Sequence, residues 1–194
     1  MAEILPGVIR KEIPLAKLKA RDCDFALWEP TTHYGEGIAR ATGGPFSHVT
    51  GLVLWNGEPW SVGFEEKRGG HACPLRAEVE RYPGKIHVFR VPGEHPIGNV
   101  RERLLDVRGE YDWANIRTLG AVYVLRWLLP FRVWQAMIAN REGRTGGGIC
   151  SRHLARSWGE GAGVRFLSKP YEQITPNDLG FSPASQYVGT PIPT

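Results

Sequence analysis

Hydrophobic residues in the first half of the chain are spaced as in short β-strands. Four segments are apolar, rich in β-branched or aromatic residues and bounded by turn residues, namely Cys23–Trp28, Ser47–Trp55, Trp60–Glu65 and Ile86–Val91. Asn56-Gly57 separates the second segment from the third, and this dipeptide strongly favours a two-residue β-hairpin. We therefore predict that the first half forms a β-meander.

Glycine and proline mark the expected loops between these strands. Residues 32–46 hold four glycines, so we expect a loop there that rims a cleft. A second loop is expected over Lys67–Gly70, before a short segment that ends at Pro74-Leu75. Pro83-Gly84 indicates one more turn ahead of the last of the four strands.

The second half has apolar residues at helical spacing. Ile97–Val107 is predicted as one helix, and Ala114–Ala139 as a longer helical stretch that is kinked or split at Pro130. A glycine-rich loop then leads to a short helix over Cys150–Trp158, which Gly159 ends. Helices thus follow strands along the chain, which is typical of the α+β class.

The 194 residues are enough for one domain with a substantial core. The sequence shows no internal repeat, low-complexity segment or domain boundary, so we predict a single domain over residues 1–194. The apolar stretch at about 114–139 is expected to be a helical insert in that domain. The tail from about Pro170 carries five prolines and is expected to wrap around the surface.

Composition is typical of a soluble globular protein, with 42% hydrophobic and 23% charged residues. The formal net charge of +4 is compatible with an anionic partner, but the sequence has no Lys/Arg run that indicates a nucleic-acid-binding arm. The N-terminus lacks the apolar core of a signal peptide. Leu119–Leu129, the longest apolar stretch, is too short for a membrane span of about 20 residues.

The cysteines Cys23, Cys73 and Cys150 are too few and too scattered for a disulfide framework, so we expect free thiols. The sequence contains no C-x-x-C pair, H-E-x-x-H motif, Walker loop or dinucleotide fingerprint. It therefore indicates neither a metal nor an organic cofactor.

Cys150 is the first candidate for chemistry because it follows three glycines and begins a predicted helix. The free N–H groups and partial positive charge of a helix N-terminus stabilise a thiolate, so we expect a lowered thiol pKa. The same N–H groups are suited to bind the oxyanion that forms when a carbonyl is attacked. The alternative is that Cys150 is a small buried hydrophobe.

His48 is the candidate base, since a histidine in a strongly apolar strand needs a partner. A neutral imidazole facing Cys150 would form the Cys–His pair of thiol hydrolases. The alternative is a structural histidine bonded to a backbone carbonyl. His153, one helical turn from Cys150, is a weaker candidate, and His71 has no partner at a comparable spacing.

Glu65 ends the strand that returns from the hairpin, so it is a candidate to orient the His48 imidazole. Glu66 is the rival because the hairpin register is uncertain by one residue, and both could instead be solvated loop charges. Three aromatic residues that flank the site in sequence are expected to wall the substrate cleft, namely Trp28, Tyr34 and Phe46.

Several motifs of the chain resemble a known family. They are D-F-A-L-W from Asp24, G-G-P-F-S-H-V-T-G-L-V-L from Gly43, F-E-E-K-R-G-G-H-A-C-P-L from Phe64, C-S-x-x-x-A from Cys150 and I-T-P-N-D-L from Ile174. Together they resemble the permuted branch of the NlpC superfamily. Its members are papain-like cysteine peptidases and amidases, with YiiX-like and bacteriophage-encoded proteins among them.

The resemblance implies a permuted papain-like fold, in which a small antiparallel sheet or half-barrel packs against helices and the nucleophile begins a helix. In papain-like enzymes the cysteine precedes the histidine, whereas here His48 precedes Cys150. The resemblance implies Cys150 as nucleophile, His48 as general base and Glu65, rather than Glu66, as the orienting residue.

The implied activity is that of a cysteine hydrolase, a peptidase or amidase that cleaves an amide bond through an acyl-enzyme. A peptidoglycan-type or isopeptide substrate and a cytoplasmic or phage-virion location are expected. One alternative is a lipid acyltransferase or thioesterase of the lecithin–retinol acyltransferase type, with Leu119–Trp134 on a membrane surface. The other is a catalytically silent phage structural or binding module.

Overall fold

The computed structural model describes residues 11–65, 69–108 and 150–193. Its strands form one sheet in the order β1-β7-β6-β2-β3-β4-β5. Neighbouring strands are antiparallel, except that β1 and β7 are parallel. The strands are β1 (Glu12–Pro14), β2 (Phe25–Trp28), β3 (His48–Trp55), β4 (Glu58–Glu65), β5 (Gly69–Pro74), β6 (Ile86–Arg90) and β7 (Gln186–Ile192).

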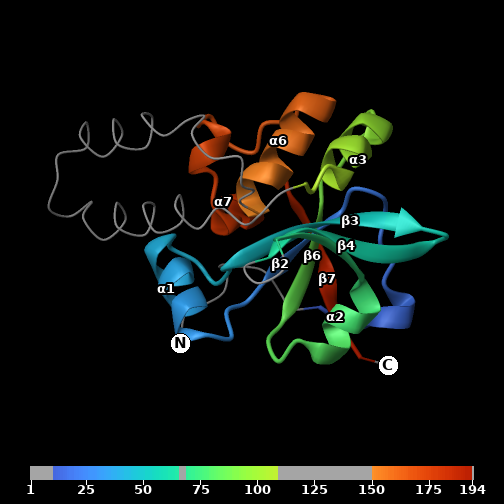
Figure 1. Cartoon of the computed structure of the whole chain (residues 1–194), viewed down its shortest axis with the longest axis vertical. Helices are drawn as coiled ribbons and strands as arrows, with labels where there is room; N and C mark the ends of the chain where they lie inside the picture. The colour runs from blue at the N-terminus through green and yellow to red at the C-terminus, as the bar shows by residue number, and fades with distance from the viewer. Residues whose placement is uncertain (1–10, 66–68, 109–149, 194) are drawn as a thin grey trace, which may run out of the picture.

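Helices cover both faces of this mixed sheet, which confirms the α+β class. Figure 1 shows α3 and α6 together on one face and α2 on the other. The described helices are α1 (His33–Ala41), α2 (Leu75–Arg81), α3 (Ile97–Leu105), α6 (Cys150–Ala162) and α7 (Pro176–Phe181), with 3-10 turns at η1 (Leu15–Lys17) and η2 (Tyr171–Gln173).

Side-chain alternation along the strands divides the core into two clusters, one on each face of the sheet. On one face, Phe25, Val49 and Val53 pack with Leu154 and Trp158 of α6. This burial of apolar surface is the main force that holds α6 against β2 and β3. Because Cys150 begins α6, the same packing fixes its position.

On the opposite face, Trp28 of β2 and Leu52 of β3 pack with Leu75 and Val79 of α2. Side chains of a strand alternate between the two faces of the sheet. His48 is four residues before Leu52 and so points to the same face, whereas Val49 points to the face covered by α6. Of the candidate site residues, Cys150 therefore lies on the α6 face of the sheet and His48 belongs to the opposite face.

The predicted hairpin and meander are confirmed for β2 to β5. Asn56 and Gly57 join β3 to β4 with φ of +51° and +79°, the left-handed values that a tight type I′ turn requires. The four strands lie side by side in chain order. β6 then crosses back to pair with β2 instead of extending the meander beyond β5.

The glycine-rich stretch 32–46, predicted as a loop, contains helix α1 instead. Thr32 caps this helix, because its Oγ1 accepts a hydrogen bond of 3.1 Å from the N–H of Gly35. Glu36 and Arg40 form an ion pair of 3.6 Å one helical turn apart. The cap and the ion pair help offset the cost of helical glycines, which is about 1 kcal/mol each.

Two further helices differ from prediction. Helix α2 follows β5 directly, where only a short segment ending at Pro74-Leu75 was expected. Helix α6 continues past Gly159 to Ala162. Gly159 and Gly161 serve close packing, since a Cβ on the first would meet the Tyr171 hydroxyl and on the second the backbone of Val100.

The proline-rich tail does more than wrap the surface. Its strand β7 lies inside the sheet, between β1 and β6. Thr190 on this strand is buried, and its N–H donates to the carbonyl of Lys11 at 2.9 Å. The C-terminal segment is therefore part of the core architecture, because β7 links β1 to the rest of the sheet.

Some predictions fall on residues that the structure does not describe. They concern the helical insert at 114–139, the glycines 146–148 and Glu66. All three cysteines are described and are free thiols, as predicted. Over the described ranges, no helix has both the length and the apolar character needed to cross a membrane.

Candidate active site

The start of β3 lies where two strands of the sheet cease to pair. In the described part of the chain, β3 and β4 pair from Trp55–Glu58 to Gly51–Val62 and no further. His48, the first residue of β3, is partnered on the other side by Trp28 of β2, and the two rings lie 5.9 Å apart. The backbone at this end of β3 is therefore available to a partner other than β4.

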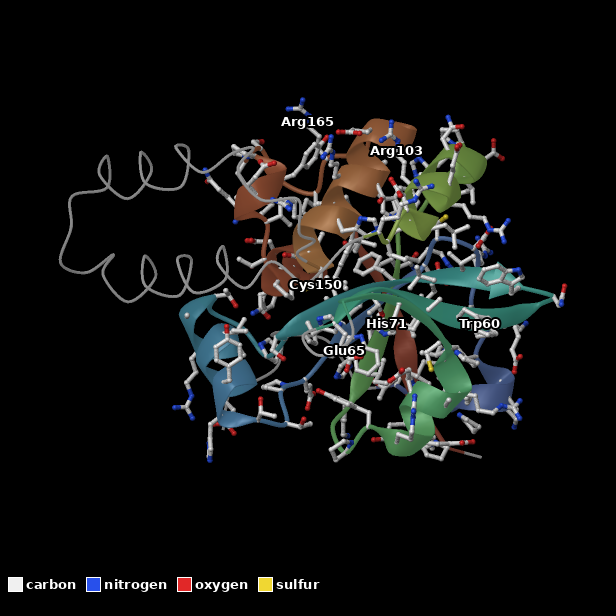
Figure 2. All side chains as sticks on the ribbon, viewed as in Figure 1. Trp60, Glu65, His71, Arg103, Cys150 and Arg165 are labelled. Carbon is white, nitrogen blue, oxygen red and sulfur yellow. The ribbon has the colours of Figure 1, made fainter. Side chains whose placement is uncertain are left out.

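That partner is Cys150, the first residue of α6, whose side chain is 6% exposed. Its thiol lies near three backbone N–H groups, its own and those of Ser151 and Val49, which act to lower its pKa. Because Val49 directly follows His48, helix α6 begins against the start of the strand that carries His48. Figure 2 shows Cys150 beside the sheet at this end of α6.

The protonation state of the Cys150 thiol is set by two opposing effects. Burial raises its pKa above the ordinary value, while the three N–H groups act to lower it. Burial is the larger effect, so the expectation of a lowered thiol pKa is wrong for the resting protein. The thiol is therefore protonated at neutral pH.

The His48 imidazole has the matching property. Burial, and secondarily the nearby charge of His71, lower its pKa from 6.5 to about 4. The ring is therefore neutral at physiological pH, which is the form that accepts a proton. At neutral pH the Cys150 thiol and the His48 imidazole are both uncharged. Cys150 lies against Val49 on the α6 face of the sheet, whereas His48, the preceding residue of β3, has the alternation of the opposite face.

Glu65 is the last residue of β4 and lies on the side of the sheet that faces away from α6 (Figure 2). If the Gly51–Val62 register is continued by three residues, Glu65 falls opposite His48. Its side chain is 40% exposed, and its Oε2 atom is 3.5 Å from Nε2 of His71. The carboxylate thus engages a second histidine, which the sequence interpretation did not include in the site.

His71 lies on β5 opposite Gly63 of β4, and its side chain is only 14% exposed. Its place could have been found from sequence only by assigning the β4–β5 register, which depends on the connection around residues 66–68. Histidine spacing along the chain says nothing about cross-strand neighbours, so no signal in the sequence pointed to this residue.

Trp28 is the aromatic residue that contacts the candidate base. Its indole N–H donates to Oγ1 of Thr50 at 3.2 Å, and Thr50 also accepts from the Ser61 hydroxyl at 2.8 Å. Tyr82 packs edge-on against the indole with ring centres 4.8 Å apart. These contacts fix the ring that borders His48.

The other two expected cleft residues lie elsewhere. Tyr34 is exposed on α1. Phe46 is 1% exposed and packs edge-on against Phe89 and His87 in the core. Phe46 is therefore a core side chain and not a wall of an open cleft, because apolar packing surrounds it.

The residues that precede His48 are tied to the C-terminal segment by Asn177. Its amide bonds both backbone groups of Phe46 at 2.9 Å, with Oδ1 accepting from the N–H and Nδ2 donating to the carbonyl. Nearby, the Ser151 hydroxyl donates to the carbonyl of Ile174 at 2.6 Å. Residues 174–177, which we call the clasp, therefore join the start of the Cys150 helix to the start of β3.

His153 has a structural role. Its Nε2 atom bonds the carbonyl of Leu104 on α3 at 3.1 Å, and its ring packs edge-on against Phe64. Burial lowers its pKa. Its ring therefore joins α6 to α3.

Comparison with known proteins gives a structural relative. No model of a known protein family matches the chain, and no curated protein sequence does. Among solved structures, the chain is similar to the metalloprotein YiiX from Escherichia coli O157:H7, with a TM-score of 0.62 and 16% sequence identity. The match covers 89% of this chain and 98% of the YiiX chain. At this identity the likeness concerns the fold, so the chain has a YiiX-like α+β fold.

Proposed function

We propose that the protein is a cysteine hydrolase, a peptidase or amidase that cleaves an amide bond through an acyl-enzyme. One observation carries the proposal, namely that the Cys150 thiol sits against the N–H of Val49, the residue next to His48. The two residues come from segments far apart in the chain. Their order, with His48 before Cys150, matches the permuted papain-like arrangement of the NlpC superfamily.

In the proposed reaction, His48 removes the thiol proton as sulfur attacks the carbonyl carbon of the substrate. A C–S bond forms and the carbonyl oxygen becomes an oxyanion. The N–H groups at the start of α6 are placed to stabilise that charge. His48 then donates its proton to the leaving amine, the C–N bond breaks, and a water activated by His48 hydrolyses the acyl-enzyme.

Glu65 is the orienting residue in this proposal, since it falls opposite His48 when the β3–β4 register is continued. Trp28 borders the imidazole and fits a role in limiting access of water to it. A neutral Cys150 thiol and a neutral His48 imidazole suit a reaction in which the proton moves to His48 while sulfur attacks. They do not suit a reaction that starts from a preformed thiolate.

The proposed substrate class is a peptide with an amide or isopeptide bond, such as a peptidoglycan cross-bridge. The net charge of +4 is compatible with an acidic polymer of this kind. A lipid acyltransferase activity would depend on residues 119–134, which lie outside the described ranges. A catalytically silent module is the second candidate, because Cys150 is buried and its thiol pKa is raised.

YiiX is described as a metalloprotein, so the donors of the present chain call for a test of fit. Across residues 11–65, 69–108 and 150–193, no three or more His, Cys, Asp or Glu side chains are grouped so that they could hold a metal ion. The described donors therefore do not match a metal centre, and the proposed steps use only the side chains named above.

Alkylation followed by mass spectrometry tests the proposal, with the three cysteines compared in one sample. Cys150 should react with iodoacetamide at neutral pH, and His48→Gln should slow that reaction by roughly 10²-fold or more, because the general base is lost. Cys23 is the internal control, since burial raises its pKa to about 12 and it should not react.

Hydrolysis of peptidoglycan peptides and isopeptides completes the test. Cys150→Ala should abolish turnover, whereas Cys73→Ala should retain it. A Cys150 that reacts no faster than Cys23, and is indifferent to His48→Gln, would show that the protein is the silent module.

A further inference from the structure

Asn177 is a buried residue of the motif I-T-P-N-D-L that the proposed mechanism does not use. In this motif Thr175 and Asp178 form the capping box of α7, and Leu179 packs in the core. Asn177 itself is 1% exposed, and its amide bonds a different part of the chain, residues 42–46. A polar side chain buried to this degree is costly unless it is bonded, so its partners define its role.

The Asn177 amide makes both hydrogen bonds that a neighbouring β-strand would make with Phe46. Its Oδ1 atom accepts from the Phe46 N–H at 2.9 Å, and its Nδ2 atom donates to the Phe46 carbonyl at 2.9 Å. An antiparallel strand exchanges the same two bonds with the residue opposite it. Asn177 therefore extends the bonding pattern of the sheet to Phe46, two residues before β3 begins.

The remaining N–H of the amide anchors the end of α1. Nδ2 of Asn177 also donates to Oγ1 of Thr42 at 2.5 Å, and this hydroxyl donates to the carbonyl of Ile38 at 2.8 Å. Gly44 lies between Thr42 and Phe46 in the chain, and a Cβ on it would clash with the Asn177 amide. Because Gly44 has no side chain, this segment can pass close to the amide.

The bonds continue from Phe46 to His48. The N–H of Ser47 donates to the carbonyl of Trp28 at 3.0 Å, and His48 then lies opposite Trp28 in the sheet. Within the described ranges, β4 does not pair with this part of β3. The location of His48 therefore depends on β2 at its side and on the segment before it, which Asn177 holds.

The clasp that carries Asn177 also bonds the helix that carries Cys150. The Ser151 hydroxyl donates to the carbonyl of Ile174, three residues before Asn177, at 2.6 Å. Figure 1 shows α7 on the same side of the sheet as α6. One short segment thus contacts the start of α6 through its backbone and the segment before His48 through the Asn177 amide.

We propose that Asn177 is a positioning residue of the active site, which bonds Phe46 so that His48 keeps the location from which it accepts the Cys150 proton. This inference rests on the proposed hydrolase function. Asn177 acts through the backbone of residues 46–48 and takes no part in the chemistry. An amide is needed because neither a carboxylate nor a hydroxyl offers one acceptor and two donors.

The test is the rate of Cys150 alkylation by iodoacetamide in the full chain. Asn177→Ala removes the three bonds and should slow the reaction roughly 10-fold or more, because the base is displaced. Ser182→Ala is the matched control, since it removes another buried bond to a carbonyl, that of Phe166, and it should leave the rate unchanged. Alkylation of the fully buried Cys23 reports any general opening of the fold.

A double-mutant cycle separates positioning from a purely structural role. If Asn177 acts through His48, Asn177→Ala should cause no further slowing in the His48→Gln protein. Additive effects of the two substitutions, or an unchanged rate in folded Asn177→Ala, would overturn the proposal. If His48→Gln itself leaves the rate unchanged, the hydrolase proposal fails and this inference fails with it. Slowing in His48→Gln without slowing in Asn177→Ala rejects the positioning role alone, so the two failures are distinguishable.

Asn177→Asp keeps the shape of the side chain and provides a pH-dependent rescue. The carboxyl that it introduces can donate to the Phe46 carbonyl only while it is protonated, and burial raises the pKa of such a carboxyl. Its alkylation rate relative to the unmodified protein should therefore be higher at about pH 5 than at about pH 8, whereas that of Asn177→Ala should not change. His48 is neutral at both pH values, since its pKa is about 4.

Thermal unfolding identifies the variants that are folded at each pH. If Asn177→Ala does not fold, Asn177→Asp provides the test by itself. Equal relative rates of folded Asn177→Asp at the two pH values would show that the donor groups of the amide do not position the base, and the proposal would be wrong.

Discussion

At the scale of single residues, Cys150 and His48 are both uncharged at neutral pH. Burial raises the pKa of Cys150 and lowers that of His48, so both effects favour the neutral pair over a thiolate–imidazolium pair. The N–H groups at the start of α6 are not strong enough to reverse this in the resting protein. In the proposed reaction they act later, when negative charge develops on a substrate oxygen.

Acid should destabilise the fold through His48. The ordinary pKa is 6.5 and the folded value is about 4, so between them the unfolded chain binds a proton that the folded chain does not. The free energy of unfolding therefore falls as pH drops from 6.5 to 4, by at most about 3 kcal/mol from this residue. Urea unfolding across this range measures the loss, which should be smaller in His48→Gln. Parallel pH profiles for the two proteins would contradict the lowered pKa.

At the scale of elements, the clasp at residues 174–177 determines how α6 and β3 meet. It bonds Ser151 on one side and Phe46 on the other. Thr175 begins α7 with a capping box in which Asp178 bonds back to its N–H at 2.7 Å. Because α7 is capped in this way, the clasp has a defined conformation of its own.

Two buried serines offer a matched test of the clasp. Ser151 and Ser182 are each 3% exposed, and each donates to one carbonyl, that of Ile174 at 2.6 Å and that of Phe166 at 2.7 Å. Replacement of either by Ala should cost about 1–3 kcal/mol in the free energy of unfolding, because a carbonyl loses its donor. Only Ser151→Ala should also slow alkylation of Cys150. Equal alkylation rates in the two variants would show that the clasp does not position the thiol.

At the scale of the whole molecule, the C-terminal strand completes the sheet. β7 lies between β1 and β6, and Thr190 on it shares hydrogen bonds with Nδ1 of His87 at 2.9 Å and with the Tyr187 hydroxyl at 2.7 Å. His87 in turn bonds the Glu29 carboxylate at 2.9 Å. A buried polar chain thus ties the end of the molecule to the strands that carry the site.

Thr190→Val keeps the shape of the side chain but removes its hydroxyl. The buried His87 ring would then lose this partner, as would the half-buried Tyr187 hydroxyl, so we expect the free energy of unfolding to fall by about 1–3 kcal/mol. Urea unfolding provides the measurement, and Thr190→Ser is the control that should stay close to the unmodified protein. A Val variant as stable as the Ser variant would mean that this polar chain contributes no stability.

The sequence by itself determined the local features. Apolar alternation located strands β2, β3, β4 and β6, Asn56-Gly57 located the hairpin, and helical spacing located α3 and the start of α6. These features depend on residues close together in the chain. The glycine-rich stretch was misassigned because a cap at Thr32 and an ion pair offset its poor helix propensity. The termination at Gly159 was misassigned because that glycine serves packing against Tyr171.

Only the tertiary structure decided what meets at the site. That Cys150 reaches Val49, that Glu65 lies 3.5 Å from His71, and that β7 enters the sheet all depend on contacts between distant segments. The pKa of the Cys150 thiol also depended on tertiary structure. The sequence shows that Cys150 begins a helix, which lowers the pKa, but it does not show the burial that raises the pKa by more. Burial and cross-strand register are properties of the packed sheet, so the spacing of residues along the chain does not encode them directly.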